Sequence, residues 1–147
     1  SVLPLIFISS ESWYVCDVTS SNFGAKGDGV VDDTHAIRSA LAQCDEVLLP
    51  SGSSFLSGPV NLTSNQRLRV DGTFLASQEK TDYAFVAPLL GYGWGDDENC
   101  FPPNMAPHKI VVGSLRYTPV IGAFHVKNVS IVGSGTIDGQ GDAWWSN

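Results

Sequence analysis

The sequence has few charged residues, little positive charge and no long apolar run. Charged residues make up 16% of the chain and hydrophobic residues 43%, which is typical of a globular protein and not of a disordered one. The eight Lys and Arg residues are scattered, whereas nucleic acids and membrane surfaces are bound through basic patches. The apolar run at 2–8 is too short to span a bilayer. We therefore expect neither nucleic acid nor a membrane as a partner.

Cysteine is also scarce, and metal or cofactor motifs are missing. Cys16, Cys44 and Cys100 include no C-x-x-C pair and the histidines are isolated, so the spacing of a zinc site is absent. The segment 26–29, Lys-Gly-Asp-Gly, lacks the preceding strand and the further glycines of a phosphate loop, and it predicts a turn with positive φ at its glycines. The acidic segment 96–98 fits no calcium-loop spacing. We predict no metal ligand and no cofactor.

Three features predict an exported protein. Residues 1–10 resemble the end of a signal peptide, an apolar run followed by small residues, although a buried first strand is the alternative. Asn61 and Asn128 each begin an Asn-x-Ser/Thr triplet, the acceptor of N-glycosylation. In an oxidising compartment the three cysteines would form one disulfide and leave one cysteine over. We expect a secreted, extracellular location.

One helix is expected, at about 33–43. Apolar residues recur there at helical spacing and form one face. These residues are Ala36, Ile37, Ala40, Leu41 and Cys44. Asp32 and Asp33 precede the run, where a carboxylate accepts hydrogen bonds from the first free backbone N–H groups and suits the positive end of the helix. Both aspartates are therefore predicted to cap the helix.

The rest of the chain predicts short strands separated by turn residues, since it contains 15 Gly and 8 Pro. The apolar clusters lie at 47–49, 55–56, 60–62, 68–70 and 73–76 and, after a long excursion at 77–109, at 109–112, 120–126, 129–132 and 135–138. Asp71-Gly72 is the nearest case to a two-residue hairpin turn, so a solenoid of parallel coils is favoured. An antiparallel sandwich is the alternative on pattern alone. The last two clusters are interpreted as adjacent rungs.

Two segments resemble a known family. Residues 22–37 resemble the opening signature of the pectin-lyase-like β-helix superfamily, and residues 127–145 resemble the polygalacturonase segment that contains Ile-Asp-Gly-Gln-Gly and Trp-Trp. The likeness covers about 16–145 and points to glycoside hydrolase family 28. It implies an all-β fold, a right-handed parallel β-helix with an N-terminal capping α-helix, truncated here. Residues 11–147 would then be the N-terminal part of a single domain.

The resemblance also implies a function: hydrolysis of α-1,4-linked galacturonan in pectin, with inversion, by a protein that is monomeric when complete. The alternatives are a β-1,3-glucanase or lyase on the same scaffold, or a non-catalytic adhesion module. The family's catalytic motifs, Asn-Thr-Asp, Asp-Asp, Gly-His-Gly and Arg-x-Lys, follow the Ile-Asp-Gly-Gln-Gly element, and only two residues follow Trp145. No catalytic residue is therefore assigned, Asp32-Asp33 included, and the isolated chain is expected to be inactive. The net charge of -7 weakly opposes binding of an acidic polysaccharide through this segment.

Structural roles are expected for the remaining conspicuous residues. The resemblance implies a disulfide between Cys16 and Cys44, whereas the residues alone also allow Cys100 to pair with either. Asp138 is expected in a turn that ends one rung, with the tryptophans at 144–145 covering the core behind it. The helix is expected to cover the open end of the solenoid, where apolar core would otherwise be exposed.

Overall fold

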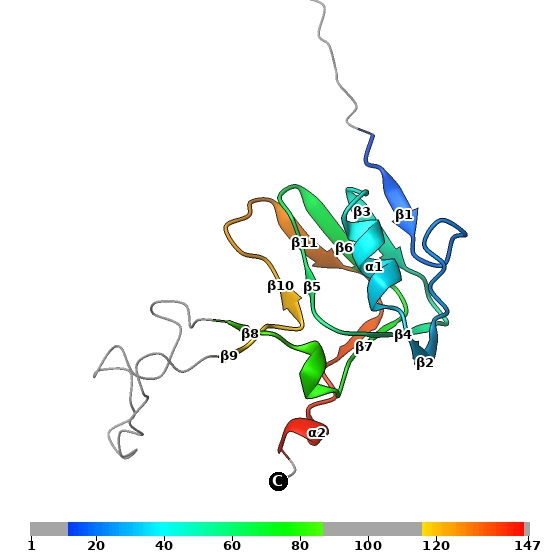
Figure 1. The fold of residues 1–147 in the computed structure, drawn as a ribbon. Coiled ribbons are helices and arrows are strands. Elements are labelled where there is room, and N and C mark those ends of the chain that lie inside the picture. The colour runs from blue at the N-terminus through cyan, green and yellow to red at the C-terminus, as the bar shows by residue number, and fades with distance from the viewer. Residues whose placement is uncertain (1–11, 87–115, 146–147) are drawn as a thin grey trace, which may run out of the picture.

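The computed structural model describes residues 12–86 and 116–145. Its short strands form three parallel sheets, here called A, B and C, around one apolar interior (Figure 1). In spatial order, sheet A contains β1 (Val15–Asp17), β3 (Glu46–Leu49), β6 (Gln66–Val70) and β11 (Val129–Val132). Sheet B contains β2 (Asp28–Asp32), β4 (Ser54–Ser57), β7 (Thr73–Ala76) and β12 (Thr136–Asp138), and sheet C contains β5 (Val60–Asn61) and β10 (Ile121–Gly122).

The chain visits the sheets in a fixed order, A then B then C. Strands β3, β4 and β5 form the second coil, β6, β7 and β10 the third, and β11 and β12 belong to the fourth. In the first coil α1 (Thr34–Leu41) follows β1 and β2 and takes the place of a strand in sheet C. Each strand pair in the three sheets is parallel, which excludes the antiparallel sandwich. The chain is a right-handed parallel β-helix, as expected.

Alternate residues of the strands point inward and stack in rows. Cys16, Val47 and Leu68 are in register on successive coils of sheet A, and Phe55 and Phe74 are in register in sheet B. All five are 5% exposed or less. A strand alternates its side chains between two faces, so each short apolar cluster supplies one or two residues to the interior. Because burial contributes about 25 cal/mol per Å² of apolar surface, these rows are the main source of stability.

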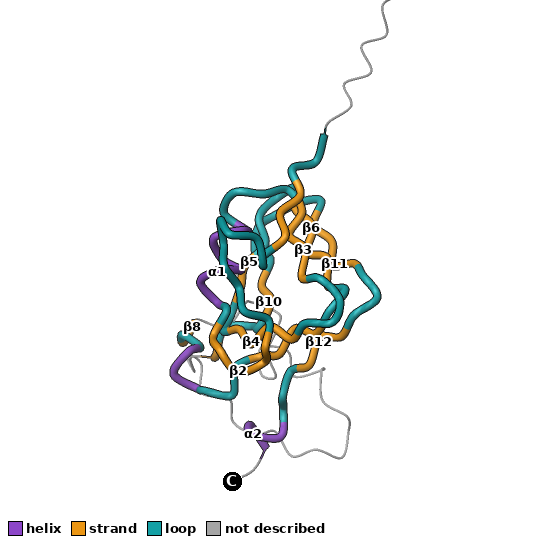
Figure 2. The backbone as a smooth tube through the Cα atoms, turned by 90° about the vertical axis from the view of Figure 1, so that its right-hand side faces the viewer, coloured by secondary structure: helices purple, strands orange, loops and turns teal. Residues whose placement is uncertain are grey.

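Helix α1 covers the interior of the first coil. Its buried residues are the predicted apolar face, Ala36, Ile37, Ala40 and Leu41. The helix packs against β3, β4 and β5, and Figure 2 shows it lying beside β5. The prediction of a capping helix is therefore confirmed. The helix ends two residues earlier than expected, because the amide of Gln43 donates to the Ala40 carbonyl only three residues back, which tightens the last turn before the chain enters β3.

Two predictions about strands are wrong. The clusters at 129–132 and 135–138 are not adjacent rungs of one stack, because β11 pairs with β6 in sheet A whereas β12 pairs with β7 in sheet B. They are two sides of a single coil. The segment 120–126 contains only the two-residue strand β10, because His125 has a φ of 52° and the chain leaves the extended conformation. The cluster predicted at 109–112 lies outside the described residues.

The long excursion begins and ends at an antiparallel pair of strands. Strand β8 (Phe85–Val86) follows the 3₁₀ turn η1 (Lys80–Asp82) and pairs with β9 (Arg116–Tyr117). A short helix, α2 (Asp142–Trp145), follows β12. Within the described ranges, no helix has the length and apolar character needed to cross a membrane.

The bend between sheets A and B depends on close backbone packing at Gly72. Its amide donates to the Leu49 carbonyl of the preceding coil at 3.0 Å. A Cβ atom at this position would lie 2.3 Å from the Pro50 carbonyl oxygen and 2.5 Å from that of Ser53. The Asp71-Gly72 pair is therefore a corner between two sheets, where only glycine lets successive coils stack.

Candidate functional site

Asp33, the second of the adjacent aspartates at 32–33, is buried, and both of its carboxylate oxygens are hydrogen-bonded to a turn. Its side chain is 3% exposed, and its two carboxylate oxygens accept hydrogen bonds from the backbone N–H groups of Lys26, at 2.7 Å, and Gly27, at 2.9 Å. It occupies the N-cap position of α1 but makes no side-chain hydrogen bond to the helix. The prediction that Asp33 caps the helix is therefore wrong: it holds the 26–29 turn against the helix start.

Asp32 performs the capping that was expected of both residues. Its Oδ1 atom accepts from the Thr34 backbone N–H at 2.8 Å and from the Thr34 hydroxyl. The Thr34 hydroxyl in turn accepts from the amide of Gly58 at 2.7 Å, which ties the helix start to the second coil. The two neighbouring carboxylates thus have separate structural partners, and the pair does not resemble the acid and base of an inverting glycosidase.

Substituting the two aspartates separately tests this division. Asp33→Asn replaces one buried acceptor oxygen with an NH₂ group that faces a backbone donor, so the free energy of unfolding should fall by about 1–3 kcal/mol. Asp32→Asn keeps an oxygen for the Thr34 amide and should cost less than about 1 kcal/mol. Urea unfolding of the two variants measures both values. Equal losses would contradict the assignment.

The 26–29 turn has the predicted backbone conformation. Gly27 and Gly29 have φ values of 62° and 75°. The exposed Asp28 carboxylate accepts from the amides of Val31 and Val30, and these bonds lower its pKa, the Val31 bond contributing most. In the described part of the chain there is no group of three or more His, Cys, Asp or Glu side chains that could hold a metal ion.

Asp138 lies in the predicted turn at the end of β12, where its Oδ1 accepts from the Gln140 amide at 2.8 Å. The prediction for the tryptophans that follow is wrong. Trp145 is 86% exposed, and Trp144 packs edge-on against Tyr83 and Tyr117 at 5.1 and 5.2 Å between ring centroids. These rings lie outside the inward rows, beside η1 and β8, so they cover the base of the excursion and not the core.

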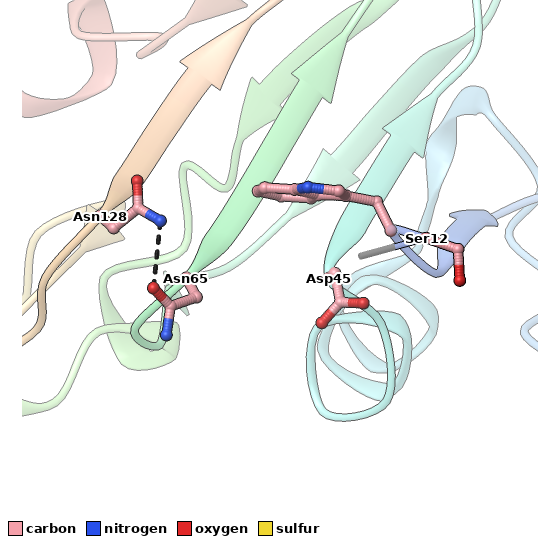
Figure 3. Close-up of a pocket in the computed structure, with 5 residues that line it drawn as sticks. Ser12, Asp45, Asn65 and Asn128 are labelled. Atoms are coloured by element: carbon pink, nitrogen blue, oxygen red, sulfur yellow. Dashed lines mark hydrogen bonds between the residues drawn. The ribbon is translucent and has the colours of Figure 1, made fainter. Parts of the chain in front are cut away.

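A row of stacked turns at the start of sheet A is a feature that sequence reasoning missed. Asp45, Asn65 and Asn128 directly precede β3, β6 and β11, and they line a polar cavity of about 260 Å³ together with Ser12 and Trp13 (Figure 3). The amide of Asn128 donates to the Asn65 oxygen at 3.0 Å, and both residues have left-handed backbones, with φ near 60°. The sequence signal that could have predicted this row is that each of the three residues comes directly before a strand of sheet A. The predicted glycosylation atom of Asn128 is thus already hydrogen-bonded within the chain.

A second cavity, of about 240 Å³, lies beside the capping helix and was also missed. It is lined by Arg38, Leu41, Ala42, Asn61 and Thr63. The cavity thus lies between the helix and the end of β5. One of its lining residues is Asn61, the other predicted glycosylation residue, which is exposed.

Cys16 and Cys44 form a disulfide, with their Cα atoms 6.0 Å apart. The bond joins the middle of β1 to Cys44, which lies between the end of α1 and the start of β3, and both cysteines are 5% exposed. Cys100 lies outside the described residues, as do 1–11 and the acidic segment 96–98.

No protein-family model matches the chain. A Vitis vinifera protein named "Probable polygalacturonase" is 32% identical to it over 155 residues, and the alignment covers 98% of the chain. The chain resembles the polygalacturonases. It spans 28% of the length of that relative.

Two solved structures share this fold. The exopolygalacturonase of Thermotoga maritima superposes with a TM-score of 0.65 and 26% identity, over 85% of this chain and 24% of that protein. The family 28 exopolygalacturonase of Yersinia enterocolitica has a TM-score of 0.65 and 24% identity, over 86% of this chain and 20% of that one. The second likeness concerns the fold alone. In both comparisons this polygalacturonase-like chain corresponds to less than a quarter of the other protein's length.

Proposed function

We propose that this chain forms the first coils of a pectin-degrading polygalacturonase. The observation that carries the proposal is the similarity to a polygalacturonase along 98% of the chain. The adjacent carboxylates of Asp32 and Asp33 are engaged in structural hydrogen bonds, and the sequence contains no Asn-Thr-Asp, Gly-His-Gly or Arg-x-Lys motif. The role of this segment is to close one end of the solenoid and to position the coils that follow.

The reaction proposed for the complete protein is hydrolysis of α-1,4-galacturonan with inversion. One carboxylic acid protonates the glycosidic oxygen while a carboxylate on the opposite face of the sugar activates a water. Those groups would be supplied by coils beyond this chain. The complete protein is proposed to act as a monomer, since a closed β-helix buries its own core.

We also propose that the protein is secreted. The disulfide between Cys16 and Cys44 supports this, because disulfides persist in oxidising compartments and are rare in the cytosol. The two Asn-x-Ser/Thr triplets agree with passage through such a compartment. Detection of the protein in culture medium or cell wall extract, free of residues 1–10, tests the location.

Release of reducing ends from polygalacturonate tests the function. The protein encoded by the complete reading frame should hydrolyse the polymer with inversion, which proton NMR of the first products detects. The 147-residue chain should release none. Cleavage of β-1,3-glucan, or unsaturated products detected by ultraviolet absorbance, would instead indicate the glucanase or lyase. No cleavage of any of these by the complete protein would favour an adhesion module.

A further inference from the structure

The cavity beside α1 combines one cation with an apolar floor and two neutral polar groups. Arg38 and Leu41 lie three residues apart, on one face of the helix, and Ala42 continues that face. Asn61 and Thr63 approach from the end of β5, against which the helix packs. At about 240 Å³ the cavity is smaller than the roughly 300–1,000 Å³ of pockets for drug-sized ligands, so it would take no more than one sugar ring.

Arg38 is held in place by hydrogen bonds that leave its charge uncompensated. Its Nε and Nη2 atoms donate to the carbonyl oxygen of Pro59, at 2.9 and 2.5 Å, so the guanidinium is fixed at the cavity rim. Arg67 and Arg69, by contrast, form ion pairs with Glu46 and Asp71. Within the described residues, 12–86 and 116–145, no ion pair involves Arg38. An oriented guanidinium with free N–H groups is well suited to bind a carboxylate.

The other lining residues suit the remainder of a sugar. In those same described ranges the side chain of Asn61 makes no hydrogen bond. Its Oδ1 lies over its partner in register, Gly122, where a Cβ atom would come within 2.3 Å of it, so the Nδ2 group is the one left to meet a sugar oxygen. The Thr63 hydroxyl contacts Gln66 Oε1 only at 3.4 Å and retains lone pairs to accept from a sugar hydroxyl. The exposed Ala42 offers apolar surface to the C–H face of a ring, whereas Leu41, 5% exposed, closes the floor beneath it.

We propose that this cavity is a binding subsite for one uronate residue of the polysaccharide, with Arg38 bound to the sugar carboxylate. The proposal rests on the proposed function, which supplies a uronate polymer as the ligand. It assigns a substrate contact to a segment whose net charge of -7 weakly opposes such binding. At this point the chain presents one exposed cation, held by two hydrogen bonds to the Pro59 carbonyl oxygen.

The subsite and a glycan at Asn61 exclude each other, because a glycan on that side chain would fill the cavity. We therefore expect Asn61 to be unmodified in the protein isolated from its natural source. Glycopeptide mapping checks this, and a glycan found on most copies of Asn61 would overturn the subsite.

Binding of trigalacturonate to the complete protein tests the subsite directly. The protein is produced in the bacterial periplasm, where disulfides form, and its N-glycan-free state is checked by mass spectrometry. Arg38→Gln should raise the Kd about tenfold, the loss expected for one charge-assisted hydrogen-bonded contact. The same variant should bind the fully methyl-esterified trimer as the wild type does. Lys26→Gln removes an equal charge at an exposed turn and should leave both Kd values unchanged.

A second variant keeps the test valid where Arg38→Gln fails to fold. Asn61→Asp leaves the hydrogen bonds of Arg38 to Pro59 intact but introduces a carboxylate, so it should also weaken trigalacturonate binding and spare the ester. Wild-type affinity in both folded variants would overturn the subsite, whatever the enzyme activity. If the wild type binds the trimer through Arg38 but releases no reducing ends from the polymer, the subsite stands and the hydrolase proposal fails.

Discussion

Replacing Phe74 with alanine is expected to lower the free energy of unfolding by about 3–5 kcal/mol, the usual cost of removing a buried phenylalanine. The side chain is fully buried in the inward row of sheet B. It is in register with Phe55 on the coil before and with Ile137 on the coil after. Truncation therefore opens a cavity between two coils, and stacked backbones held by parallel hydrogen bonds cannot collapse to fill it.

Chemical unfolding followed by circular dichroism measures this loss. Phe124→Ala is the matched control, because Phe124 is 61% exposed and loses little contact on truncation. That variant should change the free energy of unfolding by less than about 0.5 kcal/mol. A small effect at Phe74, similar to that at Phe124, would mean that the coils do not share one packed interior.

The inward rows were predictable from sequence because each one depends on a local pattern. Phe55 and Phe74 lie in short apolar clusters bounded by turn residues, and a strand four or five residues long has only one way to bury them. The face of α1 around Ile37 was predictable for the same reason, since helical spacing selects it. The apolar pattern does not tell which of the three sheets a strand belongs to. The clusters at 129–132 and 135–138 were therefore misread as neighbours in one stack.

The details of the candidate sites depend on contacts between distant residues, and the sequence does not reveal these. Asp33 and Asp32 look equivalent before a helix, yet the chain folds back so that Asp33 meets the amides of Lys26 and Gly27. Likewise, in the sequence Arg38 looks like any other scattered cation. In the structure the carbonyl of Pro59, 21 residues away, accepts from its guanidinium and orients it beside β5. The composition gives the net charge, but the fold is needed to tell which arginines form ion pairs and which do not.

Loss of the Cys16–Cys44 disulfide is expected to lower the free energy of unfolding by about 3–4 kcal/mol. The two cysteines are 28 residues apart, and in the chain-entropy model a cross-link over a loop of this length restricts the unfolded chain by that amount. The loss is large because a folded domain is stable by only about 5–15 kcal/mol. The bond also joins β1 to the end of the capping helix, so without it the first coil should open before the others.

The double variant Cys16→Ala/Cys44→Ala and the reduced wild type should show the same loss, and reductant should leave the double variant unaffected. Alanine is chosen because both positions are buried, where a serine hydroxyl would lack a partner. Full stability of the wild type in reductant would contradict the prediction, as would non-reducing peptide mapping that pairs Cys100 with either residue. A protein that depends on this bond to such an extent should fold poorly in a reducing cytosol and well after export. The stability of the capped end and the proposed secretion are therefore tested by one measurement.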